Sequence, residues 1–171
     1  EHLSVDSNGL VNLEAMEDTI TNDVLMVSIG AVNSEIGTIQ PLKAISAITQ
    51  KFGCIFHCDG AQAPLTGDIT NYSEYVDLLS LSAHKFYGPK GIGALYIRRE
   101  LKSEIEPIIY GGGQQDGLRA GTLATPLCVG FGHAAELRML PVASQQIEGL
   151  RALRNLFVER LQKASNLISL N

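Results

Sequence analysis

Three apolar segments of the sequence are each followed at once by residues that can do chemistry. In chain order these are Val24–Val32 followed by Asn33, Cys54–Cys58 followed by Asp59, and Val76–Ser82 followed by Ala83, His84 and Lys85. Near-continuous apolar runs of this length are typical of strands covered on both faces in a parallel sheet. Because ligands bind outside the carboxyl ends of such strands, we expect an amide, an acid, an imidazole and an amine to meet at one edge of the sheet.

An amine and a carboxylate at one sheet edge favour the chemistry of pyridoxal phosphate. Lys85 directly follows an apolar strand, where partial desolvation lowers the pKa of an amine and favours the neutral form that attacks a carbonyl. Asp59 on a neighbouring strand would keep the pyridine nitrogen of the cofactor protonated. Taken alone, Lys85 is interpreted as a solvated lysine, and Asp59-Gly60 as a turn. The hypothesis therefore depends on the whole set of strand ends.

Helices are expected between and after these strands. Apolar residues at helical spacing predict four helices: Leu10–Ile20, a short helix from Pro41 to Gly53, Thr125–Leu140 and Val142–Ser165. A further strand is expected at Gly93–Arg98, and Leu167–Leu170 is typical of the opening of another. Interleaved strands and helices predict an α/β fold, a mostly parallel sheet with helices on both faces.

Two later segments have distinctive compositions. Five glycines lie within Gly111–Gly121, which predicts a long loop from Gly111 to Thr122 because glycine weakens helices and strands. In the last helix one stripe is apolar, and it is interpreted as a core face, part of which can pack against a partner. Its members are Ile147, Leu150, Leu153, Leu156, Phe157 and Leu161.

Composition excludes several classes of function. The chain has 171 residues, is 45% hydrophobic and 18% charged, and carries a net charge of −5, which offers no basic surface for nucleic acid or an anionic membrane. Its longest apolar runs are too short to span a bilayer, and its first residues do not form a targeting signal. Three cysteines argue against a disulfide framework and fit a reducing compartment. A cytoplasmic protein is therefore expected.

Four motifs in order give the sequence a recognisable pattern. They are Ala31–Gly37 (AVNSEIG), His57–Gln62 (HCDGAQ), Ser82–Gly91 (SAHKFYGPKG) and Gly111–Thr122 (GGGQQDGLRAGT). Together they resemble the class V pyridoxal phosphate enzymes, and most of all the cysteine desulfurases. The resemblance implies the large domain of an aspartate aminotransferase type fold, of which residues 1–140 would be a cofactor-binding fragment. Residues 141–171 would form a helix leading out towards a C-terminal small domain, so the chain is expected to be a fragment.

The resemblance also implies a role for particular residues. It places Lys85 on the cofactor as the catalytic lysine, Asp59 at the pyridinium nitrogen, Asn33 and Gln62 at the ring hydroxyl, Ser82 and His84 at the phosphate, and Thr122 at the phosphate of the other subunit's cofactor. A homodimer, L-cysteine as substrate, an enzyme persulfide, a sulfur-acceptor protein and iron–sulfur cluster assembly follow by the same implication. The stacking histidine, the catalytic cysteine loop and the substrate-binding arginine of the family are absent from the chain. Selenocysteine lyase activity and a non-catalytic cofactor-binding or dimerisation module remain alternatives.

Competing chemistry is less well supported by the residues. Cys54, Cys58 and Cys128 lie in segments of core pattern, and buried cysteines are usually inert. A metal site at positions 54–59 fails because His57 and Asp59 point to the opposite side of a strand from the two cysteines, so no metal is expected. Lys90 lies in a Pro/Gly turn and is expected to be solvated. The glycines around it precede a strand, so no helix N-terminus is present to bind a nucleotide phosphate.

Overall fold

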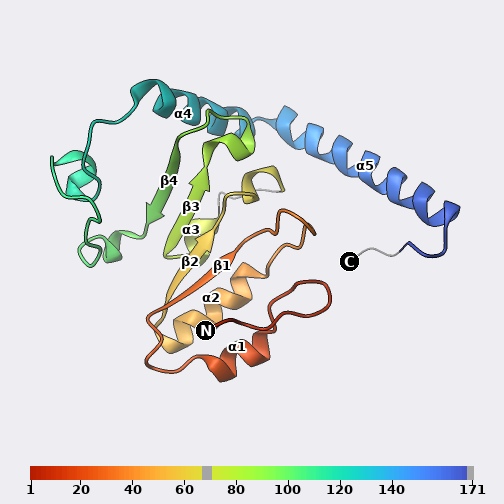
Figure 1. The fold of residues 1–171 in the computed structure, drawn as a ribbon, viewed down its shortest axis with the longest axis horizontal. Helices are drawn as coiled ribbons and strands as arrows, with labels where there is room; N and C mark the ends of the chain where they lie inside the picture. The colour runs from red at the N-terminus through yellow and green to blue at the C-terminus, as the bar shows by residue number, and fades with distance from the viewer. Residues whose placement is uncertain (67–70, 169–171) are drawn as a thin grey trace.

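A four-stranded sheet in the order β1-β2-β3-β4 forms the centre of the molecule (Figure 1). The computed structural model describes residues 1–66 and 71–168. The strands are β1 (Met26–Gly30), β2 (Ile55–Asp59), β3 (Leu78–Ser82) and β4 (Gly93–Ile97). β1 pairs with β2 and β2 with β3 in parallel, whereas β4 is antiparallel to β3. The mostly parallel sheet is confirmed, and the carboxyl ends of β1, β2 and β3 meet at one edge.

Local signals define the helix α2 (Leu42–Phe52) between β1 and β2. Pro41 precedes its first turn, and Gly53 ends it in the left-handed conformation with φ 69°, which glycine adopts without steric cost. The helix α1 (Leu13–Thr19) is shorter than expected because Asn12 caps it by accepting a hydrogen bond from the backbone N–H of Ala15 at 3.0 Å.

The remaining elements follow in chain order. They are the 3₁₀ turn η1 (Ala63–Leu65), α3 (Tyr72–Tyr75), the 3₁₀ turns η2 (Ala83–Phe86), η3 (Arg99–Leu101) and η4 (Gln114–Gly117), and the helices α4 (Thr125–Met139) and α5 (Pro141–Ala164). The break between the last two helices falls at Pro141, as predicted. Of the segment expected to open a strand, Leu167 and Ile168 are not in a strand, and the rest lies outside the described residues.

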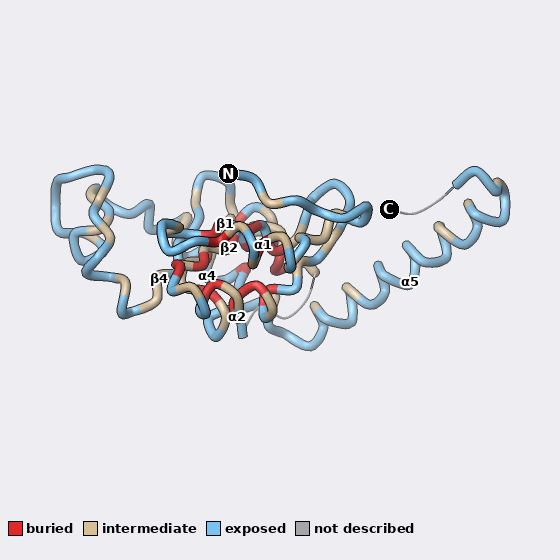
Figure 2. Tube along the Cα trace, turned by 90° about the horizontal axis from the view of Figure 1, so that it is seen from below, coloured by how far each residue is buried: buried red, intermediate tan, exposed pale blue. Residues whose placement is uncertain are grey.

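The core lies on one face of the sheet (Figure 2). In β1 the side chains of Val27 and Ile29 are buried and those of Met26 and Ser28 are exposed. Phe56 and Cys58 of β2 continue the buried face. The buried set comprises Met16, Ile20, Val27, Ile29, Ala31, Leu42, Ile45, Cys54, Phe56, Cys58, Ala63, Val76 and Leu79. The expectation that β1 is covered on both faces is therefore wrong, because every second residue of β1 is exposed.

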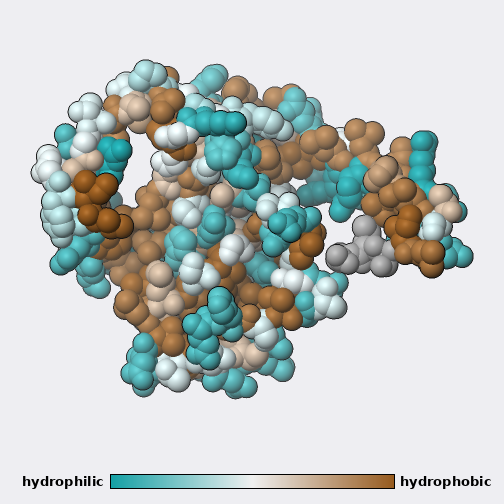
Figure 3. Space-filling model, viewed as in Figure 1, coloured by the Kyte–Doolittle hydropathy of each residue, from teal (hydrophilic) through white to brown (hydrophobic). Residues whose placement is uncertain are grey.

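The apolar stripe of α5 is not a core face. None of its described residues is buried, and Leu150, Leu153 and Phe157 are 61%, 64% and 62% exposed. α5 projects from the sheet in Figure 1, and apolar surface follows it in Figure 3. Helical spacing predicts which residues share a face, whereas burial needs a second surface, and the described chain provides none here. In the described part of the chain, no helix combines the length and apolar character needed to cross a membrane.

An ion pair joins the start of β3 to the end of β4. The Asp77 carboxylate accepts hydrogen bonds from the Arg98 Nε at 2.7 Å and from the backbone N–H of Phe56 at 2.8 Å. Arg98 also donates through Nη2 to the Val76 carbonyl at 2.9 Å. The two side chains thus connect three strands, since Phe56 belongs to β2.

Candidate active site

Asp59 is the last residue of β2 and lies at the shared edge of the parallel strands. Its Oδ1 accepts a hydrogen bond from the backbone N–H of Ala61 at 2.9 Å, and its carbonyl accepts one from Ala31 at 2.8 Å. The following Gly60 N–H donates to the Ser80 carbonyl in β3 at 2.9 Å. The carboxylate is therefore fixed through one oxygen, while Oδ2 accepts no hydrogen bond from a described residue and is available to a ligand.

The segment after β3 turns sharply and presents Ser82, His84 and Lys85. The Ser82 Oγ lies 3.1 Å from Nδ1 of His84, and Lys85 is half-buried in η2. The turn ends at Tyr87, which is exposed and has a φ of 70°, a conformation that costs a residue with a Cβ about 1 kcal/mol or more. A Cβ on Gly88 would lie 2.8 Å from the first carbonyl oxygen of η2, so only glycine fits there.

Helix α4 supports this turn from behind. The rings of Phe86 and Phe131 are tilted with centroids 5.5 Å apart, a favourable aromatic geometry. A Cβ on Gly130 would lie 3.1 Å from Cγ of Pro89, so the absence of a side chain lets the helix approach the turn closely. These contacts fix the peptide that carries Lys85, whereas the competing Lys90 is exposed.

Asn33 and Gln62 lie in the segments that follow β1 and β2. The Asn33 Oδ1 accepts hydrogen bonds from the backbone N–H groups of Glu35 at 2.9 Å and Ile36 at 3.1 Å. Because its oxygen is used in this turn, the side-chain N–H₂ group is left to donate elsewhere. Gln62 is half-buried at the start of η1. Both amides thus follow strands that end at the edge where Asp59 lies.

Thr122 does not lie with these residues. It ends the glycine-rich loop, the turquoise segment that lies to one side of β4, apart from the turn between β3 and β4 (Figure 1). The structure therefore brings Asn33, Asp59 and Gln62 to the edge where η2 begins and leaves Thr122 on a separate exposed loop. Within this loop Gln114 and Arg119 make hydrogen bonds that the sequence analysis missed. The cluster of glycines was the available signal.

Two of the three cysteines are buried as expected. Burial raises the pKa of the Cys58 thiol from 9.0 to about 12, with the neighbouring Asp59 charge adding to the shift, and burial also raises the pKa of Cys54. Cys128 is only half-buried, so the core position expected for it is wrong: Ala134 is the one described residue of α4 that is buried. The buried face of β2 carries Cys58, while His57 points to the other side, as the strand geometry predicts.

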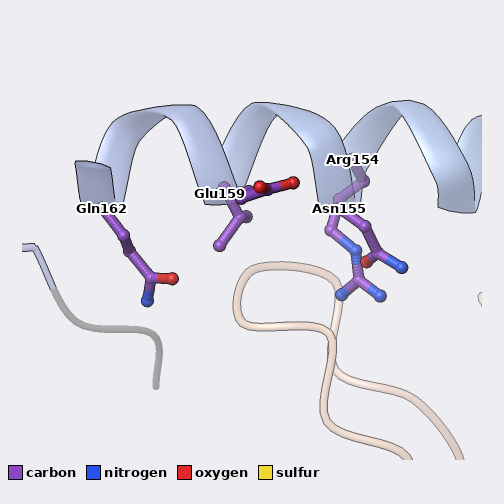
Figure 4. A pocket seen from close by; sticks show the side chains of 5 residues that line it. Arg154, Asn155, Glu159 and Gln162 are labelled. Atoms are coloured by element: carbon purple, nitrogen blue, oxygen red, sulfur yellow. The ribbon is translucent and has the colours of Figure 1, made fainter. Parts of the chain in front are cut away.

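Two hollows on the surface are lined by residues other than the candidate site residues. One is lined by α5 alone, through Arg154, Asn155, Val158, Glu159 and Gln162 (Figure 4). Another is lined by the N-terminal residues together with β1. None of the proposed cofactor-binding residues lines either hollow. In the part of the chain that the structure describes, no group of three potential metal ligands comes together.

The arrangement suits a planar cationic ring with an attached phosphate. A free carboxylate oxygen of Asp59 can accept from a protonated ring nitrogen, and the amides of Asn33 and Gln62 can donate to a ring oxygen. Ser82 and His84 offer a hydroxyl and an imidazole, both ordinary phosphate donors. With Lys85 in the same turn as His84, these donor types fit pyridoxal phosphate.

Comparison with known proteins gives consistent matches. The family described as Aminotransferase class-V matches residues 1–170. A mitochondrial cysteine desulfurase of Saccharomyces cerevisiae is 53% identical over 135 residues, covering 79% of this chain and 27% of that protein. A mitosomal cysteine desulfurase of Encephalitozoon cuniculi is 45% identical over 164 residues, covering 94% and 38%. The solved structure described as SspA in complex with cysteine has a TM-score of 0.78 at 41% identity, covering 91% and 45%. The chain thus spans less than half the length of each of these proteins.

One expectation is wrong on these findings. The sequence led us to expect a cytoplasmic protein, whereas the two relatives are named as mitochondrial and mitosomal enzymes. The relatives thus point to an organelle. A low cysteine count indicates only the absence of a disulfide framework, and it does not distinguish one reducing compartment from another.

Proposed function

The chain belongs to the class V aminotransferase family, and we propose that the protein is a cysteine desulfurase that uses pyridoxal phosphate. The observation that best supports this function is the edge of the sheet at which Asp59, Asn33 and Gln62 lie near the turn that carries Lys85. Those residue types fit pyridoxal phosphate, and the relatives named as cysteine desulfurases favour sulfur removal from L-cysteine over other reactions of the family.

Each residue has a defined task in the proposed site. Bound pyridoxal phosphate supplies an electron sink for the bonds around the substrate α-carbon. Asp59 holds a proton on the ring nitrogen through its free Oδ2, because its Oδ1 is already bonded to Ala61. The side-chain amides of Asn33 and Gln62 orient the ring through its hydroxyl, while Ser82 binds the phosphate together with His84.

Lys85 is the proposed catalytic residue. Its amine anchors the cofactor, and when free it can hold the proton that leaves or returns to the substrate α-carbon. Overall, L-cysteine and an enzyme thiol give L-alanine and an enzyme persulfide. The carbon–sulfur bond of the substrate breaks, the sulfur forms a bond to the thiolate sulfur, and carbon gains a proton in place of sulfur.

The thiol that accepts the sulfur is proposed to lie outside this chain. Cys54 and Cys58 are buried and their pKa values are raised, so few of their thiols are ionised at neutral pH. Cys128 is half-buried on α4. This helix packs against the turn that carries Lys85 through the contact of Phe131 with Phe86. By the resemblance to cysteine desulfurases, the arginine that binds the substrate carboxylate is also proposed to lie outside this chain.

Several further features belong to the same proposal. We infer a homodimer in which Thr122 reaches the phosphate at the partner's site, because its loop lies apart from the turn between β3 and β4 in one chain (Figure 1). Residues 1–140 would form the cofactor-binding part and residues 141–171 the connection to a smaller domain. Location in an organelle follows the relative named as mitochondrial, and a sulfur-acceptor protein and a role in iron–sulfur cluster assembly are proposed from the family resemblance.

The test uses the full-length protein loaded with pyridoxal phosphate and supplied with L-cysteine. We expect alanine and protein-bound persulfide sulfur in equal amounts in a single turnover, loss of both in Lys85→Ala, and retention in Lys90→Ala. A protein that releases alanine only from L-selenocysteine would be a selenocysteine lyase. Binding of cofactor without either reaction would make it a non-catalytic module, and either result would overturn the proposed function.

A further inference from the structure

The glycine-rich loop is closed on itself by two of its own side chains. The backbone N–H of Gly121 donates a hydrogen bond to Oε1 of Gln114 at 3.1 Å. The Nη1 of Arg119 donates to the carbonyl oxygen of Gly121 at 2.9 Å. Both polar groups of one glycine are therefore held by side chains, and the residue that follows is Thr122. We call this pair of contacts the Gln114–Arg119 clasp.

Two glycines of the loop make room for the clasp. A Cβ on Gly112 would lie 2.5 Å from Oε1 and 2.9 Å from Nε2 of Gln114, so the Gln114 amide occupies the space that a side chain would need. A Cβ on Gly121 would lie 3.2 Å from Nη1 of Arg119, and its φ of 99° favours glycine as well. By contrast, a Cβ on Gly113 would meet nothing within 4 Å. The space taken by the clasp therefore explains glycine at positions 112 and 121, but not at position 113.

The loop also holds a costly backbone shape. Gln115, Asp116 and Gly117 have consecutive φ values of 51°, 57° and 84°, and each of the two residues with a Cβ costs about 1–2 kcal/mol in this conformation. Such a shape persists only where surrounding contacts specify it. The turn is held by a hydrogen bond from the Leu118 N–H to the Gln115 carbonyl at 3.2 Å, by an ion pair between Lys102 and Asp116, and by the clasp.

The clasp determines the direction of the next peptide group. In a trans peptide the carbonyl oxygen and the following N–H point to opposite sides, and the described chain has no cis peptide bond. Because Arg119 holds the Gly121 oxygen, the N–H of Thr122 points away from the guanidinium. Thr122 is exposed, and neither its N–H nor its hydroxyl donates to a described residue.

We propose that Gln114 and Arg119 are positioning residues, which hold the Gly121 peptide so that Thr122 presents its N–H and hydroxyl to a phosphate. The inference rests on the proposed function, in which that phosphate belongs to pyridoxal phosphate at the partner's site. It adds two residues that act through Thr122 and do not themselves bind the ligand.

The test compares variants of the full-length holoenzyme by the rate of cofactor release and by phosphorus NMR of the bound phosphate. We expect Gln114→Met and Gly112→Ala to release pyridoxal phosphate about tenfold faster, the equivalent of about 1.4 kcal/mol, and to shift the phosphate signal. Gln114→Glu keeps an acceptor for the Gly121 N–H and restores slow release. Gly113→Ala is the matched control, since its new Cβ meets no atom within 4 Å, and it retains the wild-type rate.

A second comparison separates positioning from a general loss of structure. In a Thr122→Ala background, Gln114→Met should add little to the release rate, because the group through which it acts is gone. Additive effects of Gln114→Met and Thr122→Ala, wild-type release in Gln114→Met, or equal effects of Gly112→Ala and Gly113→Ala would overturn the inference. Failure of the proposed function is recognised separately, since the wild-type protein would then either carry no cofactor on Lys85 or bind it without converting L-cysteine to alanine.

Discussion

Removing the Asp77 carboxylate should destabilise the fold far more than removing an exposed carboxylate. In Asp77→Ala the Arg98 guanidinium loses its partner at 2.7 Å, and the Phe56 N–H loses an acceptor at 2.8 Å. The side chains of Arg98 and Asp77 are 33% and 25% exposed, so water replaces the lost contacts only in part.

The expected loss follows from these contacts. A hydrogen bond to a charged group contributes about 1.5–3 kcal/mol, whereas a buried pair broken on one side costs about 3–5 kcal/mol. Partial exposure reduces the second figure, so we expect Asp77→Ala to lower the free energy of unfolding by about 2–3 kcal/mol. Glu159→Ala is the control, because Glu159 and Lys163 pair at 2.5 Å on the surface of α5 with exposures of 58% and 73%, and such pairs contribute about 0.5 kcal/mol or less.

Urea unfolding of both variants, followed by far-ultraviolet circular dichroism, measures the two losses. A similar midpoint for Asp77→Ala and Glu159→Ala would refute the reasoning, because it would mean that the connection of β2, β3 and β4 through Asp77 carries no more energy than a surface contact. The comparison requires that the slope of the unfolding free energy against urea concentration is the same in both variants.

Other predictions follow from single contacts. Burial raises the pKa of Cys58 from 9.0 to about 12. Between these two pH values the folded chain keeps a proton that the unfolded chain loses, so the free energy of unfolding should fall by about 1.4 kcal/mol per pH unit. Urea titrations at several alkaline pH values should show a shallower decline in Cys58→Ala, and an equal decline would contradict the burial argument. Half-buried Cys128 should react with iodoacetamide in the folded chain, whereas Cys58 should react only after unfolding. Gly88→Ala should cost about 1–3 kcal/mol, because its Cβ would lie 2.8 Å from a backbone oxygen of η2. By contrast, Gly132→Ala in α4 meets nothing within 4 Å and should stabilise by up to about 1 kcal/mol; thermal melting that ranked the two variants the other way would refute this assignment. Phe157→Ala should change the melting temperature of this chain little, since the ring is 62% exposed, and a large loss would mean that α5 packs more tightly than described.

The sequence predicted best the features that depend on neighbouring residues. Pro41 and Gly53 bound α2 because a helix start and a left-handed helix end are set by local backbone preferences. The placement of Asp59 and Lys85 after parallel strands followed from strand length and order alone. The direction of β4 could not be read in this way, since a strand pattern does not specify whether its partner is parallel.

Features that depend on distant surfaces were harder to predict. The stripe on α5 has helical spacing, yet Leu150 and Phe157 remain exposed because the described chain offers no surface to cover them. The partners Asp77 and Arg98 lie 21 residues apart and meet only through the pairing of β3 with β4. Motif resemblance named Thr122 but gave no reason for Gln114, whose role depends on the folded loop.

Covalent mapping of the cofactor tests the central claim most directly. The full-length protein is incubated with pyridoxal phosphate, reduced with borohydride, digested and analysed by mass spectrometry. The account predicts a single pyridoxyl-modified peptide that carries the label on Lys85 and is lost in Lys85→Ala. Label on Lys90, label scattered over exposed lysines, or no stoichiometric label would contradict the assignment of this sheet edge as a pyridoxal phosphate site.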